Sequence, residues 1–275
     1  MRFPNQTKLA ARSWVSAISL GVLLLSIEVA YAGMTPEEVK MFRLSTLRAE
    51  KGYAQDQLLL AVCYHDGLGV QKDFERAVSW YRKAAEQGHP EAQDQLARCY
   101  YFGEGVAKDY AQATSFWRKA ADNGLAEAQV NLARCYYSGE GVAKDYELAV
   151  FWYRKAAELG NAKGQLNLGI RYSKGEGVKK DDKLAVNWYL KAAEQGLTDA
   201  QFILSYNYYT GRGVAKDEVE AYAYLNLSGV TDEDARRSLA EIESKLSRDE
   251  ISAGQKRTRD LRKEIEDKMA AKKSK

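Results

Sequence analysis

A glycine-rich motif with a lysine and an aspartate is the most chemically suggestive stretch of the sequence. It begins at Gly103 as Gly-Glu-Gly-Val-Ala-Lys-Asp, and similar segments begin at Gly67, Gly139, Gly175 and Gly211. Glycines close to a lysine are typical of loops that hold phosphate groups with backbone amides. A phosphate loop, however, follows a strand and contains Gly-Lys-Ser/Thr or Gly-x-Gly-x-x-Gly, whereas this motif recurs between helix-forming segments. We therefore interpret it as a turn between two helices.

Three cysteines could support redox or metal chemistry. Cys63, Cys99 and Cys135 are separated by 36 residues and so occupy equivalent positions in successive repeats, a column that continues as Arg171 and Asn207. Equivalent positions on stacked helices lie roughly 8 to 10 Å apart, whereas a disulfide needs Cα atoms within about 7 Å. We expect no disulfides among them and interpret them as small, partly buried side chains, with a redox or metal role as the alternative.

Histidine-based chemistry has little support. His65 and His89 are the two histidines, and neither lies in the Cys/His spacing of a zinc site. The sequence also lacks the Gly-x-Ser-x-Gly and His-Glu-x-x-His motifs of common hydrolases. It therefore predicts no catalytic residues, no metal and no cofactor, and an enzyme would need a site assembled across repeats.

The charge balance argues against a nucleic-acid-binding protein. The formal net charge is +3, and most of it is carried by Arg2, Lys8 and Arg12 against Glu28 in the first segment of the chain. The remainder is nearly neutral and gives no basic surface for a phosphate backbone. Three prolines in 275 residues, with many Ala, Leu, Glu and Lys, favour helices.

The 36-residue period divides each repeat into two helices joined by the glycine turn. On the first helix, leucine and tyrosine columns are four residues apart with a small residue beside each leucine, which is typical of a helix face packed closely on a neighbour. The glutamine, leucine and tyrosine columns are Gln57, Gln93, Gln129, Gln165, Gln201; Leu60, Leu96, Leu132, Leu168, Leu204; and Tyr64, Tyr100, Tyr136, Tyr172, Tyr208.

The second helix of each repeat begins after an aspartate, which we expect to cap it by accepting hydrogen bonds from unpaired amides. It ends at a glycine, the residue best suited to a left-handed C-cap. An aromatic column on this helix is expected to fill the space beside the small residues of the first helix. The three columns are Asp73, Asp109, Asp145, Asp181, Asp217; Gly88, Gly124, Gly160, Gly196; and Trp80, Phe116, Trp152, Trp188, Tyr224.

The complete repeat resembles the Sel1-like repeat family. The pattern Ala-Gln-x-x-Leu-Ala-x-x-Tyr-x-x-Gly-x-Gly-Val-x-x-Asp-x-x-x-Ala-x-x-Trp-Tyr-x-Lys-Ala-Ala-x-x-Gly is nearly complete from Ala92 to Gly124 and from Ala128 to Gly160. The resemblance implies an all-α, right-handed, tetratricopeptide-like solenoid of helix-turn-helix repeats with helical caps. It also implies a protein-interaction scaffold, often in exported bacterial proteins. Departures at the two ends, such as Asp56 in an alanine column, are expected of terminal repeats.

The N-terminal segment has the pattern of an export signal. Basic residues are followed by an apolar run from Trp14 to Ile27 and by small residues at Ala30 and Ala32. We predict a signal peptide over residues 1–32, cleaved between Ala32 and Gly33, and hence a periplasmic or secreted protein that meets the membrane only through this peptide. The alternative is an uncleaved anchor, since the run is only slightly short of the roughly 20 residues needed to span a bilayer.

Non-repetitive segments flank the repeats. Residues 33–53 are predicted to form an N-terminal capping helix that starts at Thr35, and residues 54–231 to form five repeats of 36 residues. Residues 232–275 are predicted to form a capping helix followed by a basic helical tail. This tail could bind anionic lipid or a partner helix, or could be solvated.

The face of the first helices that points away from the core is the candidate binding surface. In the tetratricopeptide-like arrangement this face lines a concave groove, where repeated amides and guanidinium groups could bind a peptide backbone or carboxylate. The alternative is a solvated helix face. The candidate partner-binding residues are Gln95, Arg98, Tyr101, Asn131, Arg134, Tyr137 and Asn167.

Two functions are consistent with these patterns. The first is a non-enzymatic periplasmic or secreted scaffold that binds a protein or peptide, in envelope signalling or assembly. The apolar residues Leu59, Phe202, Ile203 and Tyr206 at the ends of the candidate surface favour a protein ligand. The second is a hydrolase acting on cell wall or β-lactams, which is implied only by cysteine-rich members of the resembled family.

Overall fold

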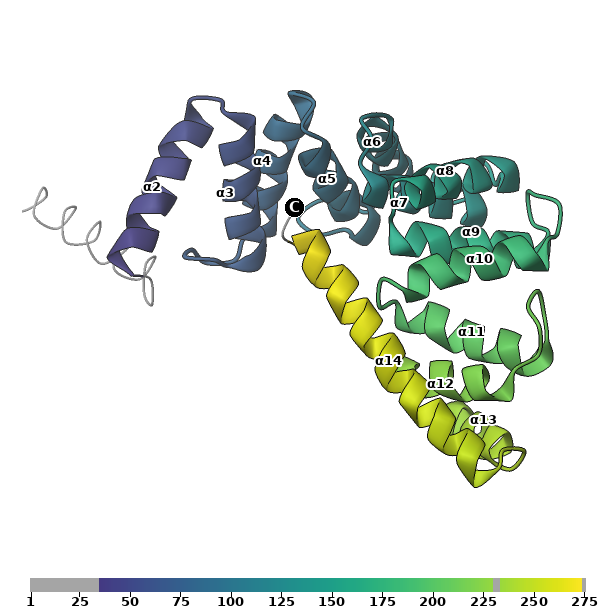
Figure 1. The fold of residues 1–275 in the computed structure, drawn as a ribbon. Coiled ribbons are helices and arrows are strands. Elements are labelled where there is room, and N and C mark those ends of the chain that lie inside the picture. Colours follow the sequence, from purple (N-terminus) through teal and green to yellow (C-terminus); the bar gives the residue numbers. More distant parts are fainter. Residues whose placement is uncertain (1–34, 230–232, 274–275) are drawn as a thin grey trace, which may run out of the picture. The chain divides into compact units, whose positions relative to one another are not determined.

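The computed structural model describes residues 35–229 and 233–273, and in these residues every regular element is an α-helix (Figure 1). The predicted all-α architecture of helix-turn-helix repeats is thereby confirmed. The helices are α2 (Pro36–Glu50), α3 (Ala54–Asp66), α4 (Phe74–Glu86), α5 (Pro90–Phe102), α6 (Tyr110–Asp122), α7 (Ala126–Ser138), α8 (Tyr146–Glu158), α9 (Ala162–Lys174), α10 (Asp182–Ala193), α11 (Thr198–Thr210), α12 (Glu218–Ser228), α13 (Glu233–Glu243) and α14 (Arg248–Lys273).

The helices belong to two compact units, one with α2 to α5 and one with α6 to α14. Consecutive helices pack against each other from α2 to α5 in the first unit and from α6 to α13 in the second, where α14 packs on α12. The odd-numbered helices α3 to α11 are the first helices of the repeats, called A helices below. The even-numbered helices α4 to α12 are the second, called B helices. The packing of the A helices on the B helices within a unit determines where each candidate binding residue lies.

The glycine motif forms the turn between an A helix and a B helix, as predicted. Gly139 follows α7 with a left-handed φ of 79°, and its amide donates to the Cys135 carbonyl at 2.8 Å. Asp145 then caps α8, because its carboxylate accepts a hydrogen bond from the Leu148 amide at 2.9 Å. Asp73, Asp181 and Asp217 cap their helices in the same way.

The second glycine of the motif has a role that the sequence did not reveal. Gly177 has a φ of +69°, and a Cβ added there would lie 2.1 Å from the carbonyl oxygen of Tyr146, at the start of the preceding B helix. A Cβ added at Gly141 would likewise lie 2.0 Å from the Tyr110 carbonyl oxygen. At these two points the backbones of successive repeats lie so close together that no side chain fits between them. The motif therefore both reverses the chain and joins neighbouring repeats.

The glutamine column joins each A helix to the B helix before it. The side-chain amide of Gln165 donates to the carbonyl of Ala157 at 3.2 Å, and Gln165 is 5% exposed. Helix ends leave carbonyls without intrahelical partners, and a buried carbonyl must find one elsewhere. The other four glutamines bond in the same way to carbonyls eight residues earlier, at Ala49, Ala85, Ala121 and Ala193.

The predicted core aromatic column is correct at Trp152 and Tyr224, which are buried, but its other members, Trp80, Phe116 and Trp188, are half-buried. Trp188 is only half-buried, whereas the following residue, Tyr189, is 3% exposed. A Cβ at Gly169 of α9 would lie 2.5 Å from the Tyr189 ring, so this ring fills the space beside the small residue. Adjacent residues of a helix point in directions about 100° apart, and positions 188 and 189 both carry aromatic side chains. The sequence therefore favoured the column in which tryptophan recurs more regularly. The half-buried aromatics are instead covered by lysines, such as Lys191, 4.0 Å from the Trp188 ring.

The N-terminal helix α2 packs on α3 in the first unit. Ala49 is 1% exposed, and Arg48 forms an ion pair with Asp56 at 3.1 Å. This pair explains the aspartate in the alanine column of the first repeat, because it faces the capping helix. None of the described helices is long and apolar enough to cross a membrane. The predicted signal peptide and its cleavage site lie outside the described residues.

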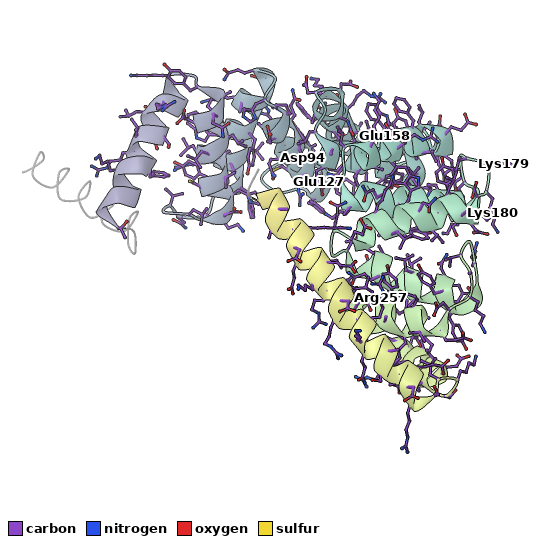
Figure 2. The ribbon with its side chains drawn as sticks, viewed as in Figure 1. Asp94, Glu127, Glu158, Lys179, Lys180 and Arg257 are labelled. Atoms are coloured by element: carbon purple, nitrogen blue, oxygen red, sulfur yellow. The ribbon has the colours of Figure 1, made fainter. Side chains whose placement is uncertain are left out.

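The C-terminal helix α14 packs along α12. Arg257, labelled in Figure 2, forms an ion pair with Glu220 at 2.8 Å, and the Thr258 hydroxyl donates to the Ala223 carbonyl at 3.3 Å. Leu261 and Ile265 are 6% and 8% exposed. The sequence left open a solvated or lipid-binding tail, but this helix is docked on the repeats at least as far as Ile265.

Candidate functional site

The candidate residues of the second unit lie on α7 and α9, which contact each other. On α7, Arg134 is exposed while Asn131 and Tyr137 are half-buried; on α9, Asn167 is half-buried. Glu127, labelled in Figure 2, joins the two helices at their N-terminal ends by accepting hydrogen bonds from Asn161 at 3.1 Å and Lys163 at 3.0 Å. These four predicted residues thus lie on two neighbouring A helices, and the surface that they and the equivalent positions of other A helices are predicted to form is called the helix-A face below.

The remaining candidates lie on α5 in the first unit. Arg98 is exposed, whereas Gln95 and Tyr101 are half-buried. Each occupies the position equivalent to that of its counterpart on α7, because the residues are 36 positions apart. Tyr101 also stacks edge-on against Phe102, with ring centroids 5.0 Å apart. These three residues therefore form an equivalent surface within their own unit.

Arg134 of the arginine column lies over a core aromatic ring. The Arg134 guanidinium carbon is 5.9 Å from the centre of the Trp117 ring, and Trp117 is fully buried. In the first unit, burial raises the pKa of Tyr81, and the positive charge of Arg98 opposes that rise. An arginine resting on a rigid aromatic ring keeps its planar head at the surface in a restricted position.

Tyr137 is held in a packed cluster. The guanidinium of Arg171 lies 4.0 Å from its ring centre, and the ring of Tyr146 is 5.3 Å away. Arg171 is itself 5% exposed and forms an ion pair with Glu176. Tyr137 therefore contributes more to packing between repeats than its variable position in the sequence indicated. The sequence signal for this cluster was the replacement of cysteine by arginine at position 171.

The cysteines of that column are unpaired in the structure. Cys99 and Cys135 are buried and Cys63 is half-buried. Burial raises the pKa of the Cys99 thiol to about 12 and also raises those of Cys63 and Cys135. A thiol that stays protonated is a poor nucleophile, so this chemistry supports the predicted packing role.

The helix-A face changes from polar to apolar along the second unit. The column of Asn131 and Asn167 continues on α11 as Ile203, and the column of Arg134 continues there as Tyr206. Ile203 packs partly buried against the core, whereas Tyr206 is 56% exposed. An exposed aromatic beside apolar neighbours is a common feature of protein-binding surfaces.

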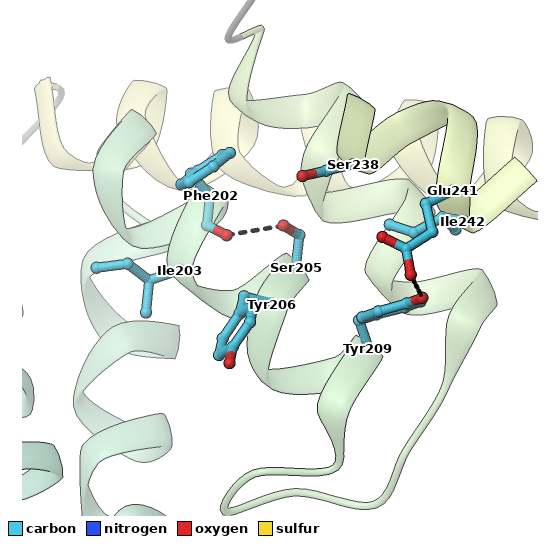
Figure 3. Close-up of a pocket in the computed structure, with 8 residues that line it drawn as sticks. All are labelled: Phe202, Ile203, Ser205, Tyr206, Tyr209, Ser238, Glu241 and Ile242. Atoms are coloured by element: carbon cyan, nitrogen blue, oxygen red, sulfur yellow. Dashed lines mark hydrogen bonds between the residues drawn. The ribbon is translucent and has the colours of Figure 1, made fainter. Parts of the chain in front are cut away.

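At the apolar end of this face, α11 and α13 enclose a pocket (Figure 3). Its volume is about 300 Å³. Its lining residues are Phe202, Ile203, Ser205, Tyr206 and Tyr209 of α11 and Ser238, Glu241 and Ile242 of α13. Sequence reasoning identified the apolar side chains of α11 but not the pocket, because α13 lies outside the repeats and its docking has no periodic signal.

The polar groups around the pocket are already engaged within the protein. The Ser205 hydroxyl donates to the Phe202 carbonyl at 2.7 Å, and the Tyr209 hydroxyl donates to Glu241. The hydrogen bond from Tyr209, together with Lys245, holds the pKa of the Glu241 carboxyl below its usual range. The Tyr209 hydroxyl likewise raises the pKa of Lys245. A group bound in the pocket would consequently make mainly apolar contacts.

The described residues contain no group of three or more His, Cys, Asp or Glu side chains that could hold a metal ion. His65 contacts Asp66 at 2.6 Å and Glu104 at 3.3 Å, within the first unit. His89 contacts the Glu91 carboxylate at 3.1 Å. Both histidines therefore make local polar contacts between or within repeats.

Comparison with known proteins identifies the repeats. The family model described as Sel1 repeat matches five consecutive segments, residues 54–89, 90–125, 126–161, 162–197 and 198–229. No curated protein matches the chain.

Two solved structures are similar over most of the chain. One is c5321, described as a protective antigen present in uropathogenic Escherichia coli strains and displaying an SLR fold. It is 35% identical with a TM-score of 0.78, and the match covers 87% of this chain and 52% of that protein. The other is a Sel1 repeat protein from Oxalobacter formigenes, 33% identical with a TM-score of 0.68, covering 75% and 88% respectively. The chain thus spans about half the length of c5321.

Proposed function

Because the chain belongs to the Sel1 repeat family, we propose that it is a non-enzymatic scaffold that binds a protein or peptide through the helix-A face. Proteins built from these repeats generally serve as protein-interaction modules. The observation that carries the proposal is the arginine column. Arg98 and Arg134 are exposed at equivalent positions of their units, and the Arg134 guanidinium carbon lies 5.9 Å from the centre of the buried Trp117 ring of the preceding B helix. An exposed guanidinium on either unit is suited to bind a carboxylate of a ligand.

The neighbouring asparagines supply hydrogen-bonding groups for a peptide backbone. The side-chain nitrogen of Asn167 donates to the Lys163 carbonyl at 2.8 Å, which orients the amide and directs its oxygen to act as an acceptor. Asn131 occupies the equivalent position on α7. A face that is ordered before binding loses little conformational entropy on association, and this favours affinity.

We also propose that the protein acts in the periplasm or outside the cell, in envelope signalling or assembly. This part rests on the basic residues, apolar run and Ala30-Tyr31-Ala32 site of residues 1–32. N-terminal sequencing of the protein purified from its native host tests it. A mature chain that starts at Gly33 is the expected result, and a retained N-terminal segment would support the anchor alternative.

Peptide selection tests the binding function. The purified protein is used to select binders from a random twelve-residue phage library, and their dissociation constants are measured by fluorescence anisotropy. The double variant Arg98→Ala/Arg134→Ala is expected to bind selected peptides about tenfold or more weakly, because charged hydrogen bonds are lost. The control Arg82→Ala/Arg118→Ala removes two exposed arginines of B helices and should leave binding unchanged. Equal binding by both double variants would refute the helix-A face as the site.

A further inference from the structure

We propose that the pocket between α11 and α13 anchors one aromatic or branched aliphatic side chain of an acidic, extended segment of a partner protein. In this arrangement, a carboxylate side chain of the same segment reaches Arg134. The inference rests on the proposed function and specifies the ligand. It combines three observations: the pocket itself, the change in polarity along the helix-A face, and the charges beside that face.

The size and lining of the pocket fit a side chain better than a larger ligand. About 300 Å³ is at the lower limit of small-molecule sites and accommodates one large apolar side chain. Phe202, Ile203 and Ile242 supply apolar walls, and Tyr206 forms an exposed lip beside them (Figure 3). Because Ser205 and Tyr209 already donate to acceptors of the protein, a polar ligand group in the pocket would gain little.

The position of the pocket sets the spacing within the ligand. Arg134 is on α7 and the pocket is on α11, so they are separated by two steps between neighbouring A helices. Packed helices lie about 8 to 10 Å apart, which gives roughly 16 to 20 Å in total. An extended chain advances about 3.3 Å per residue. We therefore expect about five or six residue steps between the anchor side chain and the carboxylate.

The charge of the face selects an acidic ligand. Arg134, at the end of the face away from the pocket, is an exposed cation. The nearby carboxylates are neutralised, since Glu127 pairs with Lys163 and Glu241 accepts from Tyr209 and pairs with Lys245 at 3.4 Å. A carboxylate of the segment would therefore meet complementary charge at Arg134, whereas a cation placed there would be repelled. The carboxylate is assigned to an Asp or Glu side chain of a separate protein.

Selection from the phage library tests the ligand chemistry. The expected consensus is an aromatic or branched aliphatic residue followed or preceded, five or six positions away, by Asp or Glu. Changing the carboxylate of a selected peptide to its amide should weaken binding about tenfold to the unmodified protein and not to Arg134→Ala. Amidation of the peptide C-terminus should have no effect. Loss of binding on that amidation would overturn the side-chain assignment.

Two variants test the pocket. Ser238→Trp fills it from α13 and should weaken binding at least tenfold, while Ser244→Trp, an exposed position on the turn after the same helix, should not. Tyr206→Ala removes the exposed lip without opening the core and should also weaken binding. Circular dichroism checks that each variant is folded. If Ser238→Trp is folded and binds normally, the pocket assignment is wrong.

The outcomes separate this inference from the proposed function. Peptides that depend on Arg98 and Arg134 but are insensitive to Ser238→Trp and Tyr206→Ala would refute the pocket and leave the scaffold function intact. A library that yields no binders would contradict both. Light scattering that shows a concentration-dependent dimer, abolished by Ser238→Trp, would assign the pocket to a second copy of the chain and also overturn the inference.

Discussion

The close contact at the second glycine of the turn gives a sharp test of how the repeats are held together. In Gly177→Ala, the new Cβ would lie 2.1 Å from the Tyr146 carbonyl oxygen, far inside van der Waals contact, so the turn must move away from α8. The residue would also keep a φ of +69°, which is unfavourable for alanine. We therefore expect the loss of a contact between repeats in addition to local strain.

The magnitude follows from these two costs. A left-handed conformation costs an alanine about 1 to 2 kcal/mol, and forcing an added methyl into a packed site costs about 1 to 3 kcal/mol more. Gly177→Ala should thus lower the free energy of unfolding by about 2 to 5 kcal/mol. Gly160→Ala is the matched control, because Gly160 has a φ of +82° but no atom within 4 Å of the added Cβ. It should lose only about 1 to 2 kcal/mol.

Urea denaturation followed by circular dichroism at 222 nm measures both variants. Cooperativity can break down in repeat arrays, so the transition midpoint and slope are compared together. The expected order of stability is unmodified protein, then Gly160→Ala, then Gly177→Ala. Equal destabilisation by the two substitutions would show that backbone strain alone accounts for the glycine, and would refute the contact between repeats.

Two further perturbations test the packing of the C-terminal helix and of the cysteine column. Leu261→Ala should lower the free energy of unfolding by about 2 to 5 kcal/mol, because Leu261 is only 6% exposed. Met269→Ala, at a position that is 44% exposed, should have little effect. Thermal melts compare the two variants. The Cys99 thiol should react with a disulfide reagent at pH 8 only after unfolding. Since burial raises the pKa of the Cys99 thiol to about 12, the stability that the protonated thiol contributes should be lost as the pH rises from about 9 toward 12. Urea titrations across this pH range can show the loss.

The period of the sequence was sufficient to predict most of the repeat architecture. Residues such as Asp145 and Gly139 act through local backbone geometry, so their roles follow from their types and spacing. The choice between Trp188 and Tyr189 as core residue could not be made, because two adjacent aromatics differ only in their direction around the helix. The second glycine of the motif, Gly177, could be predicted only as part of a turn. Its close contact is with the preceding repeat, and the pattern within one repeat does not reveal that contact.

Features outside the period were harder to predict. The docking of α13 and α14 depends on tertiary contacts such as Arg257 with Glu220, which have no repeated counterpart. The pocket was therefore hidden, although Phe202, Ile203 and Tyr206 indicated an apolar end to the surface. The cluster of Arg171 and Tyr137 was also missed, since a single replacement in a column does not reveal its partners.

Site-specific photo-crosslinking tests the binding surface most directly. A benzophenone amino acid is placed at Tyr206 on the helix-A face or at Phe151 on a B helix, two aromatic positions that are 56% and 47% exposed. Irradiation with a selected peptide, followed by mass spectrometry, locates the ligand. We predict crosslinking at position 206 and not at 151. Crosslinking at 151 alone, or equally at both, would contradict binding through the helix-A face.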